Sequence, residues 1–232
     1  SNKPSCGTTQ CVALAQAAPK FETKPFQHSI STLAVTVPWM ATTTIGNDSS
    51  RDFGNITVNT SGTLIVQAQP AAYHIKQLSL AYSATLKLPA GDYWIEKLLL
   101  DSSSNIEVVG AGTVRLFVRE SVVVPWMTKI NDNTKDAGKF IFYSYSDVVF
   151  NTANNIYALV YAEGDGKLEY ATAIHGTFSA RNIILATDSQ VTYKPEAVAL
   201  ANDGNLCDSD QPLPDLTPPL LTLNTLAASA ES

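Results

Sequence analysis

Paired carboxylates are the first chemistry to look for in this sequence. Glycoside hydrolysis needs two carboxyl groups about 5–9.5 Å apart, flanking the scissile bond. Glu163, Asp165 and Glu169 are close together, but Gly164 and Gly166 predict a turn there rather than a catalytic strand. Signatures of serine nucleophiles, phosphate loops and calcium-binding nonapeptide repeats are absent. We therefore expect no catalytic residues, no cofactor and no enzymatic activity.

Thiols and metal ligands are sparse. Three cysteines are present, and Cys6 and Cys11 lie in a Gly/Thr/Gln turn where a local disulfide is sterically easy. Such a bond indicates an oxidising compartment and an exported protein. Pairing of either one with Cys207 stays open. The three histidines are scattered along the chain and do not predict a metal site.

Aromatic residues are the better indication of binding. Outward-facing rings on a rigid sheet can stack on sugars or dock protein partners. The residues predicted to do so are Trp94, Tyr143, Tyr145, Tyr157 and Tyr161.

The tripeptide Pro-Trp-Met occurs twice, as Pro38-Trp39-Met40 and as Pro125-Trp126-Met127. The favoured interpretation is that both tryptophans plug the core beside a proline bend. The alternative is a shared ligand site.

An apolar pattern that repeats along the chain must position all of these residues. Its members are displaced by 20 residues between the second and third copies and by 22 between the first and second. All twenty positions of four copies are apolar in a chain that is 45% hydrophobic. The copies are Phe53, Ile56, Val58, Leu64 and Val66; Ile75, Leu78, Leu80, Leu86 and Leu88; Ile95, Leu98, Leu100, Ile106 and Val108; and Ala180, Ile183, Leu185, Val191 and Tyr193.

The repeat predicts a stack of short parallel strands, one strand spacing (about 4.8 Å) apart. Leu78 should lie on Leu98 and Leu80 on Leu100, while Pro89-Ala90-Gly91-Asp92 should turn between two copies. The prediction is an all-β, parallel right-handed β-solenoid of about seven coils, with an irregular N-terminal cap and a proline-rich C-terminal tail. An antiparallel sandwich with coincidental spacing is the alternative. The expected boundaries are 1–50 for the N-terminal segment and cap, 51–195 for the solenoid and 196–232 for the tail.

Charge and hydropathy exclude several partners. Charged residues make up 16% of the chain, the net charge is −6, and Lys and Arg do not cluster, so nucleic acid is a poor partner. No apolar run approaches the ~20 residues of a membrane-spanning helix, so membrane insertion is not expected. The oligomeric state is left open.

Several phrases in order resemble a known family. They include Leu88-Pro-Ala-Gly-Asp-Tyr-Trp-Ile95, Asn155-Ile-Tyr-Ala-Leu-Val-Tyr-Ala-Glu-Gly164 and Ser189-Gln-Val-Thr-Tyr193. Together they resemble the repeat region of MshQ-type proteins, which are encoded with the mannose-sensitive haemagglutinin (type IV) pilus systems of Gram-negative bacteria. The resemblance covers residues 70–193 and implies a secreted or cell-surface, pilus-associated protein without known catalytic residues.

We therefore expect a non-catalytic extracellular solenoid module of a pilus-associated or cell-surface adhesin. Its expected partners are pilus or cell-surface proteins, and glycans bound on an exposed face. The alternatives are a solenoid carbohydrate-active enzyme, a lyase or hydrolase, and a self-polymerising scaffold of the bactofilin type.

Overall fold

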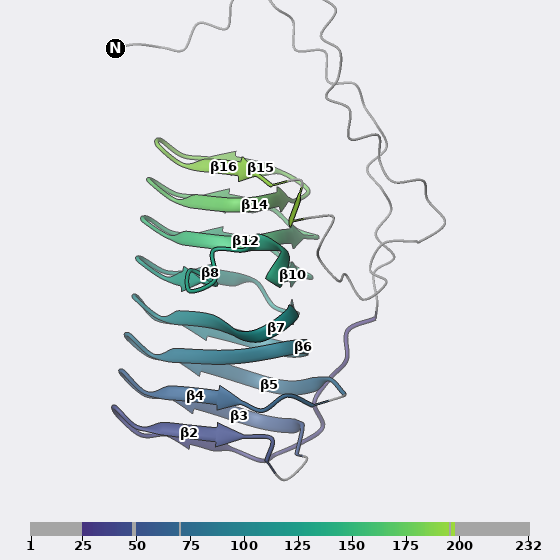
Figure 1. Cartoon of the computed structure of the whole chain (residues 1–232). Helices are drawn as coiled ribbons and strands as arrows, with labels where there is room; N and C mark the ends of the chain where they lie inside the picture. The colour runs from purple at the N-terminus through teal and green to yellow at the C-terminus, as the bar shows by residue number, and fades with distance from the viewer. Residues whose placement is uncertain (1–24, 48–49, 70, 195, 198–232) are drawn as a thin grey trace, which may run out of the picture. The chain divides into compact units, whose positions relative to one another are not determined.

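The chain folds as a parallel β-solenoid. The computed structural model describes residues 25–47, 50–69, 71–194 and 196–197, all of which belong to one compact unit, Lys24–Gly204. These residues form about eight turns, stacked from β2 at one end to β15 and β16 at the other (Figure 1). The predicted fold class is thereby confirmed, with about eight turns where about seven were expected. The predicted disulfide residues, Cys6 and Cys11, lie outside the described residues, as does Cys207.

Two parallel sheets build the turns. The twelve-stranded sheet contains β1 (Val35–Val37), β2 (Thr42–Ile45), β3 (Asp52–Val58), β4 (Thr63–Val66), β5 (Tyr73–Leu80), β6 (Thr85–Leu100), β7 (Asn105–Val118), β9 (Lys129–Ile130), β10 (Phe140–Ser144), β12 (Asn155–Ala162), β14 (Ala173–Ser179) and β16 (Gln190–Tyr193). The four-stranded sheet contains β8 (Val122–Val124), β11 (Val148–Phe150), β13 (Gly166–Leu168) and β15 (Ile183–Leu185). One short 3-10 helix, η1 (Ala137–Lys139), follows β9.

The predicted register is the observed one. Leu78 pairs with Leu98 and Leu80 with Leu100, and every pair of neighbouring strands is parallel among the described residues. This excludes the antiparallel sandwich. The inward side chains form one continuous core, and each buried Leu, Ile or Val contributes about 1.5–3 kcal/mol relative to an exposed one.

Polar side chains form columns on the outside of the same strands. Lys87 lies opposite Glu107 in register, and its Nζ is 3.5 Å from the Glu107 carboxylate. This pair was expected from the repeat and, being partly exposed, adds at most about 1 kcal/mol.

The turns differ from expectation at two points. The first turn lies upstream of residue 51, because β1 pairs with β3 and β2 with β4. The expected turn at Pro89–Asp92 is instead a bend within the continuous strand β6, with a register shift between Pro89 and Gly91. The chain does change direction between the two copies at this point, but no separate loop is formed, because β6 keeps its hydrogen bonds to the neighbouring strand on both sides of the bend.

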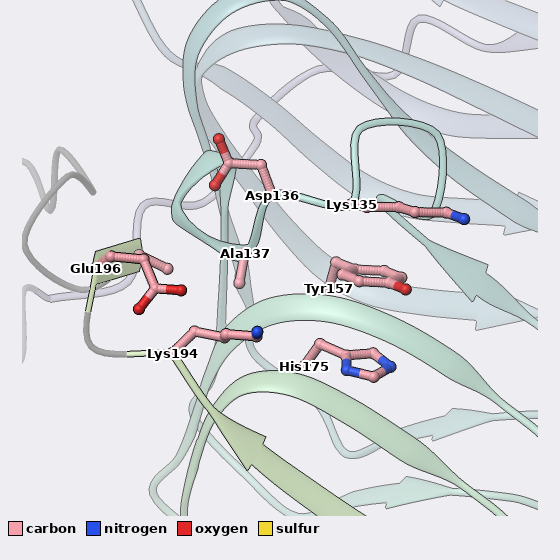
Figure 2. Close-up of a pocket in the computed structure, with 8 residues that line it drawn as sticks. Lys135, Asp136, Ala137, Tyr157, His175, Lys194 and Glu196 are labelled. Carbon is pink, nitrogen blue, oxygen red and sulfur yellow. The ribbon is translucent and has the colours of Figure 1, made fainter.

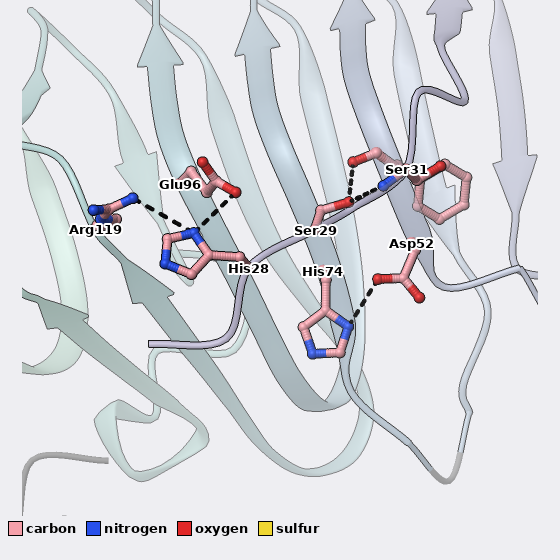
Figure 3. A network of polar contacts seen from close by, with 8 residues as sticks. His28, Ser29, Ser31, Asp52, His74, Glu96 and Arg119 are labelled. Carbon is pink, nitrogen blue, oxygen red and sulfur yellow. Dashed lines mark hydrogen bonds and ion pairs between the residues drawn. The ribbon is translucent and has the colours of Figure 1, made fainter. Parts of the chain in front are cut away.

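The segment that precedes β1 crosses several turns from the outside (Figure 3). Ser29 Oγ donates a hydrogen bond of 2.8 Å to the carbonyl oxygen of Phe53. His28 Nδ1 lies 3.2 Å from the Glu96 carboxylate and 3.4 Å from the Arg119 guanidinium. Because these partners lie in different turns, the segment links turns that otherwise contact only their neighbours.

The two ends of the described solenoid are unequal. In the first turn, Val37 and Ile45 are buried. In the last turn, side chains that continue the inward columns are more than one-third exposed; they are Ile183, Leu185, Val191 and Tyr193. The fourth copy of the repeat is thus in the predicted register but lies at an end that no described turn covers.

Candidate functional site

Four of the five predicted aromatic residues lie together on the outer side of the solenoid. Trp94 stacks on Phe117 with ring centroids 4.1 Å apart and planes 12° apart. Tyr143 lies 4.8 Å from both Tyr145 and Tyr161. These rings come from β6, β7, β10, β12 and the residue after β10, so the solenoid stacks them into a ladder.

The middle of this ladder is buried, and its members Tyr145 and Tyr161 are partly exposed. Trp94 is 1% exposed and Tyr143 is 2% exposed. Phe26 of the crossing segment packs edge-on against Trp94 at 5.6 Å and against Tyr145 at 5.5 Å. The ladder is an outer extension of the packing, and it leaves Trp94 and Tyr143 no free ring face for a ligand.

Ionisation within the ladder is suppressed. Tyr143 Oη donates a hydrogen bond of 2.8 Å to the Glu163 carboxylate. Burial, together with this carboxylate, raises the pKa of Tyr143. Burial and then Glu163 raise the pKa of Tyr145 to about 12. Both phenols remain protonated at neutral pH, as packed side chains should.

The fifth predicted residue, Tyr157, lies apart from the ladder and lines a shallow pocket (Figure 2). Its ring stacks on His175 with centroids 4.5 Å apart and planes 17° apart. Lys135 extends alongside Tyr157, and the ammonium group of Lys194 points toward His175. Desolvation and then the Lys194 charge lower the pKa of His175, so its ring is neutral at pH 7.

This pocket is small. Its volume is about 170 Å³, whereas sites for small molecules commonly exceed about 300 Å³. One face of the Tyr157 ring is already occupied by His175. The pocket is therefore a weak candidate for a sugar chain.

Two carboxylates do occupy equivalent positions in neighbouring turns, although the repeat columns did not predict them. Asp147 and Asp165 precede β11 and β13, and the Asp165 backbone N–H donates to the Asp147 carboxylate at 2.7 Å. Hydrogen bonds from Asn182 and then Arg181 lower the pKa of Asp165. A glycosidase general acid needs a raised pKa, so the lowered pKa of Asp165 does not suit it for that role.

A different set of aromatic residues is exposed. These residues lie in a short connection between two strands that recurs once in every turn. This connection joins β1 to β2, β3 to β4, β5 to β6, β6 to β7, β8 to β9, β11 to β12, β13 to β14 and β15 to β16. In each case one non-glycine residue has a positive φ of 52–60°; these residues are Met40, Ser61, Ser83, Ser103, Met127, Ala153, Ala171 and Asp188. Each of the first seven donates its backbone N–H to the carbonyl oxygen of the residue preceding its counterpart in the next turn, at 2.9–3.3 Å. We call this set of connections the aromatic corner.

The residue before each positive-φ position forms an outer row along the aromatic corner. Aromatic and hydroxyl side chains alternate strictly in this row, in the order Trp39, Thr60, Tyr82, Ser102, Trp126, Thr152, Tyr170 and Thr187. The exposed fractions of the four rings are 68%, 51%, 51% and 53% in chain order. The interpretation that Trp39 and Trp126 plug the core was wrong, because the left-handed residue that follows each of them turns the chain and leaves the ring outside.

Beneath the row lies a buried polar column, in which Asn154 holds the backbone by side-chain hydrogen bonds. Asn154 accepts a hydrogen bond from the Thr128 N–H at 2.8 Å and donates to the carbonyl oxygens of Val124 and Asn151 at 3.0 and 2.8 Å. Ser104, Thr128 and Thr172 are buried at equivalent positions. The aromatic corner is thus a rigid support for the rings it carries.

Sequence reasoning missed Tyr82 altogether, and it counted Tyr170 among the aromatic residues of the later turns without predicting it as a binding residue. A usable signal exists, since Trp39, Tyr82, Trp126 and Tyr170 follow one another at intervals of about 44 residues, which is twice the repeat. The tripeptide repeat pointed to two of these residues, but the tyrosines lack its Pro and Met neighbours.

Among the described residues, no group of three His, Cys, Asp or Glu side chains could hold a metal ion. That part of the chain also has no helix long and apolar enough to cross a membrane. Comparison with protein-family models, with curated proteins and with solved structures gives no match to this chain.

Proposed function

We propose that this chain is a rigid, non-catalytic, extracellular module of a pilus-associated or cell-surface adhesin that binds glycans. The observation that carries this proposal is the row of four exposed rings on the aromatic corner. Exposed aromatics on a fixed backbone bind apolar faces of a partner at little entropic cost, because few torsions must be frozen.

The pilus association rests on the resemblance to MshQ-type proteins between residues 70 and 193. A solenoid suits a surface spacer, because each turn adds about 4.8 Å of length through local contacts alone. The expected partners are accordingly pilus or other cell-surface proteins, together with glycans.

A binding screen tests the proposal. The purified chain is incubated with insoluble polysaccharides and a glycan array, and in parallel with assembled type IV pili. We expect retention on at least one glycan class with no release of new reducing ends. Retention by pili alone would remove the glycan role, and release of reducing ends that an Asp165→Asn variant abolishes would establish an enzyme instead.

A second candidate function is self-assembly, which the exposed last turn favours. Ile183, Leu185, Val191 and Tyr193 present apolar surface beside the edge of β15 and β16, with which no described strand pairs. Such an edge readily adds another strand. Head-to-tail stacking would also need exposed inward side chains in the first turn of another copy. The inward side chains Val37 and Ile45 of the first turn are buried instead. Light scattering at rising protein concentration tests this candidate, and a mass that stays monomeric excludes it.

A further inference from the structure

The outer row of the aromatic corner has a fixed spacing along the solenoid. Neighbouring turns are about 4.8 Å apart, so rings two turns apart are separated by about 10 Å. Trp39 and Tyr170 are six turns apart, which places the ends of the row about 29 Å from each other. Because the backbone of every turn is hydrogen bonded to the next at this corner, the spacing does not depend on flexible loops.

The side chains between the rings are hydroxyl-bearing rather than apolar. Thr60, Ser102 and Thr152 separate the four rings and can each donate and accept a hydrogen bond. A protein-docking patch usually has a contiguous apolar centre. Here single rings alternate with single hydroxyl groups, an arrangement that suits a ligand with apolar faces and hydroxyl edges in regular alternation.

The residues immediately beside the row supply no positive charge to a polyanion. The residues on either side of each row position include three acids and no Lys or Arg; the acids are Asp101, Glu169 and Asp188. Single-stranded nucleic acids also stack on rows of aromatic residues, but their sites supply positive charge for the phosphates. An uncharged ligand fits this surface better than any polyanion.

We propose that the outer row binds an extended, uncharged polysaccharide chain that lies along the solenoid axis, with one ring for every two sugar residues. The distance of about 10 Å between rings, which is twice the strand spacing, is the length of two pyranose units in a flat, extended chain. This inference rests on the proposed glycan-binding function and specifies its ligand.

Each ring adds to the affinity because later contacts are made within the same complex. Once one ring holds the chain, the next contact has a high effective concentration, provided that the ligand can span the gap. Affinity should therefore rise in steps as the oligosaccharide becomes long enough to reach a second ring and then a third. A ligand with a bent or helical backbone loses this gain.

The experiment uses the full chain with β-1,4-linked glucan and β-1,4-linked N-acetylglucosamine oligosaccharides, from the disaccharide to the octasaccharide, measured by calorimetry. The wild type should bind the longest oligosaccharides best and polygalacturonate weakly. The Trp126→Ala variant should lose at least tenfold in affinity for the octasaccharide. Tyr193→Ala is the matched control, since Tyr193 is equally exposed but lies outside the row, and its affinity should change less than twofold.

A register variant separates spacing from hydrophobicity. Trp126→Ala combined with Thr152→Trp keeps four rings on the corner but moves one of them by one turn. We expect this variant to bind the octasaccharide as weakly as Trp126→Ala alone. Circular dichroism and thermal melting verify that each variant folds, since Trp126 is about half exposed and Thr152 is partly buried.

The outcomes separate the two levels of the argument. Wild-type affinity in the register variant would overturn the spacing, and wild-type affinity in Trp126→Ala would overturn the row as the site while the glycan-binding function stands. Binding of oligosaccharides irrespective of their length would overturn the extended-chain ligand. If the wild type binds no polysaccharide at all, the proposed function and this inference both fail.

Discussion

Truncation of one leucine at two levels of the same column tests how the solenoid is stabilised. Leu168 and Leu185 are paired in register on β13 and β15, and both continue the same inward column. Leu168 is 0% exposed because a turn lies on each side of it, whereas Leu185 is 52% exposed in the last turn. The two sites thus share chemistry and backbone conformation and differ in burial.

The expected losses follow from burial. Leu168→Ala removes buried methyl groups and leaves a cavity that neighbouring turns cannot close, which costs about 3.5 kcal/mol. Leu185→Ala loses about half of the transfer free energy and leaves no closed cavity, so it costs about 1 kcal/mol. The difference between the two variants is a direct measure of what one covering turn contributes.

Urea unfolding followed by far-UV circular dichroism measures both losses. With a slope of about 2.5 kcal/mol/M, the midpoint should fall by about 1.4 M for Leu168→Ala and by about 0.4 M for Leu185→Ala. Ile184→Ala is the control, because Ile184 is outward-facing and 55% exposed, and it should match Leu185→Ala. Equal losses at positions 168 and 185 would refute the reasoning, since they would mean that the last turn is covered as fully as the interior.

Three further predictions concern the corner and the ladder. Ala153→Gly should raise the free energy of unfolding by about 1 kcal/mol in thermal melts, because glycine adopts the positive φ of 59° without strain; Ala158→Gly in β12 should lower it by about 0.5–1 kcal/mol, and a loss at both sites would contradict the assigned strain. Asn154→Ala should cost about 3 kcal/mol in urea unfolding by leaving buried backbone groups unpaired, and a loss below 1 kcal/mol would show that water replaces the amide. The pKa of Tyr145 is raised from 10 to about 12 in the fold, so the stability linked to its protonated phenol is present below pH 10 and is lost as the pH rises toward 12. The free energy of unfolding of Tyr145→Phe, measured by urea unfolding, should therefore fall less between pH 10 and 12 than that of the wild type. An equal fall in both proteins would refute the linkage.

The apolar repeat contains enough information to predict the stacking. A displacement of 20–22 residues that preserves the internal order of five apolar positions can be satisfied by parallel turns, which bury every position on its counterpart. Leu78, Leu98 and their equivalents accordingly lie in the predicted register. The pair Lys87–Glu107 follows from the same displacement, because residues that alternate along a strand inherit the register of their inward neighbours.

The predicted binding residues show the limit of such reasoning. Trp94 was predicted to face outward and bind a ligand, and Trp39 was predicted to plug the core, but Trp94 is buried and Trp39 is exposed. Trp94 is covered by a stacked neighbour and by Phe26, which lies far away in the sequence. Trp39 stays exposed because the left-handed residue after it turns the backbone at the corner. The exposure of an outward ring therefore depends on contacts with segments far away in the sequence and on the local backbone conformation. The spacing of the apolar repeat predicts neither.

The amino-acid sequence by itself therefore determines which positions of the apolar repeat face inward and which turn lies on which, because burial of a periodic apolar pattern permits one register. The tertiary structure alone decides which outward rings remain free. The path of the N-terminal crossing segment covers the ladder around Trp94 and Tyr143, while hydrogen bonds between successive corners hold Trp39, Tyr82, Trp126 and Tyr170 in one exposed row. Contacts between segments far apart in the chain set both outcomes, so only the folded molecule reveals them.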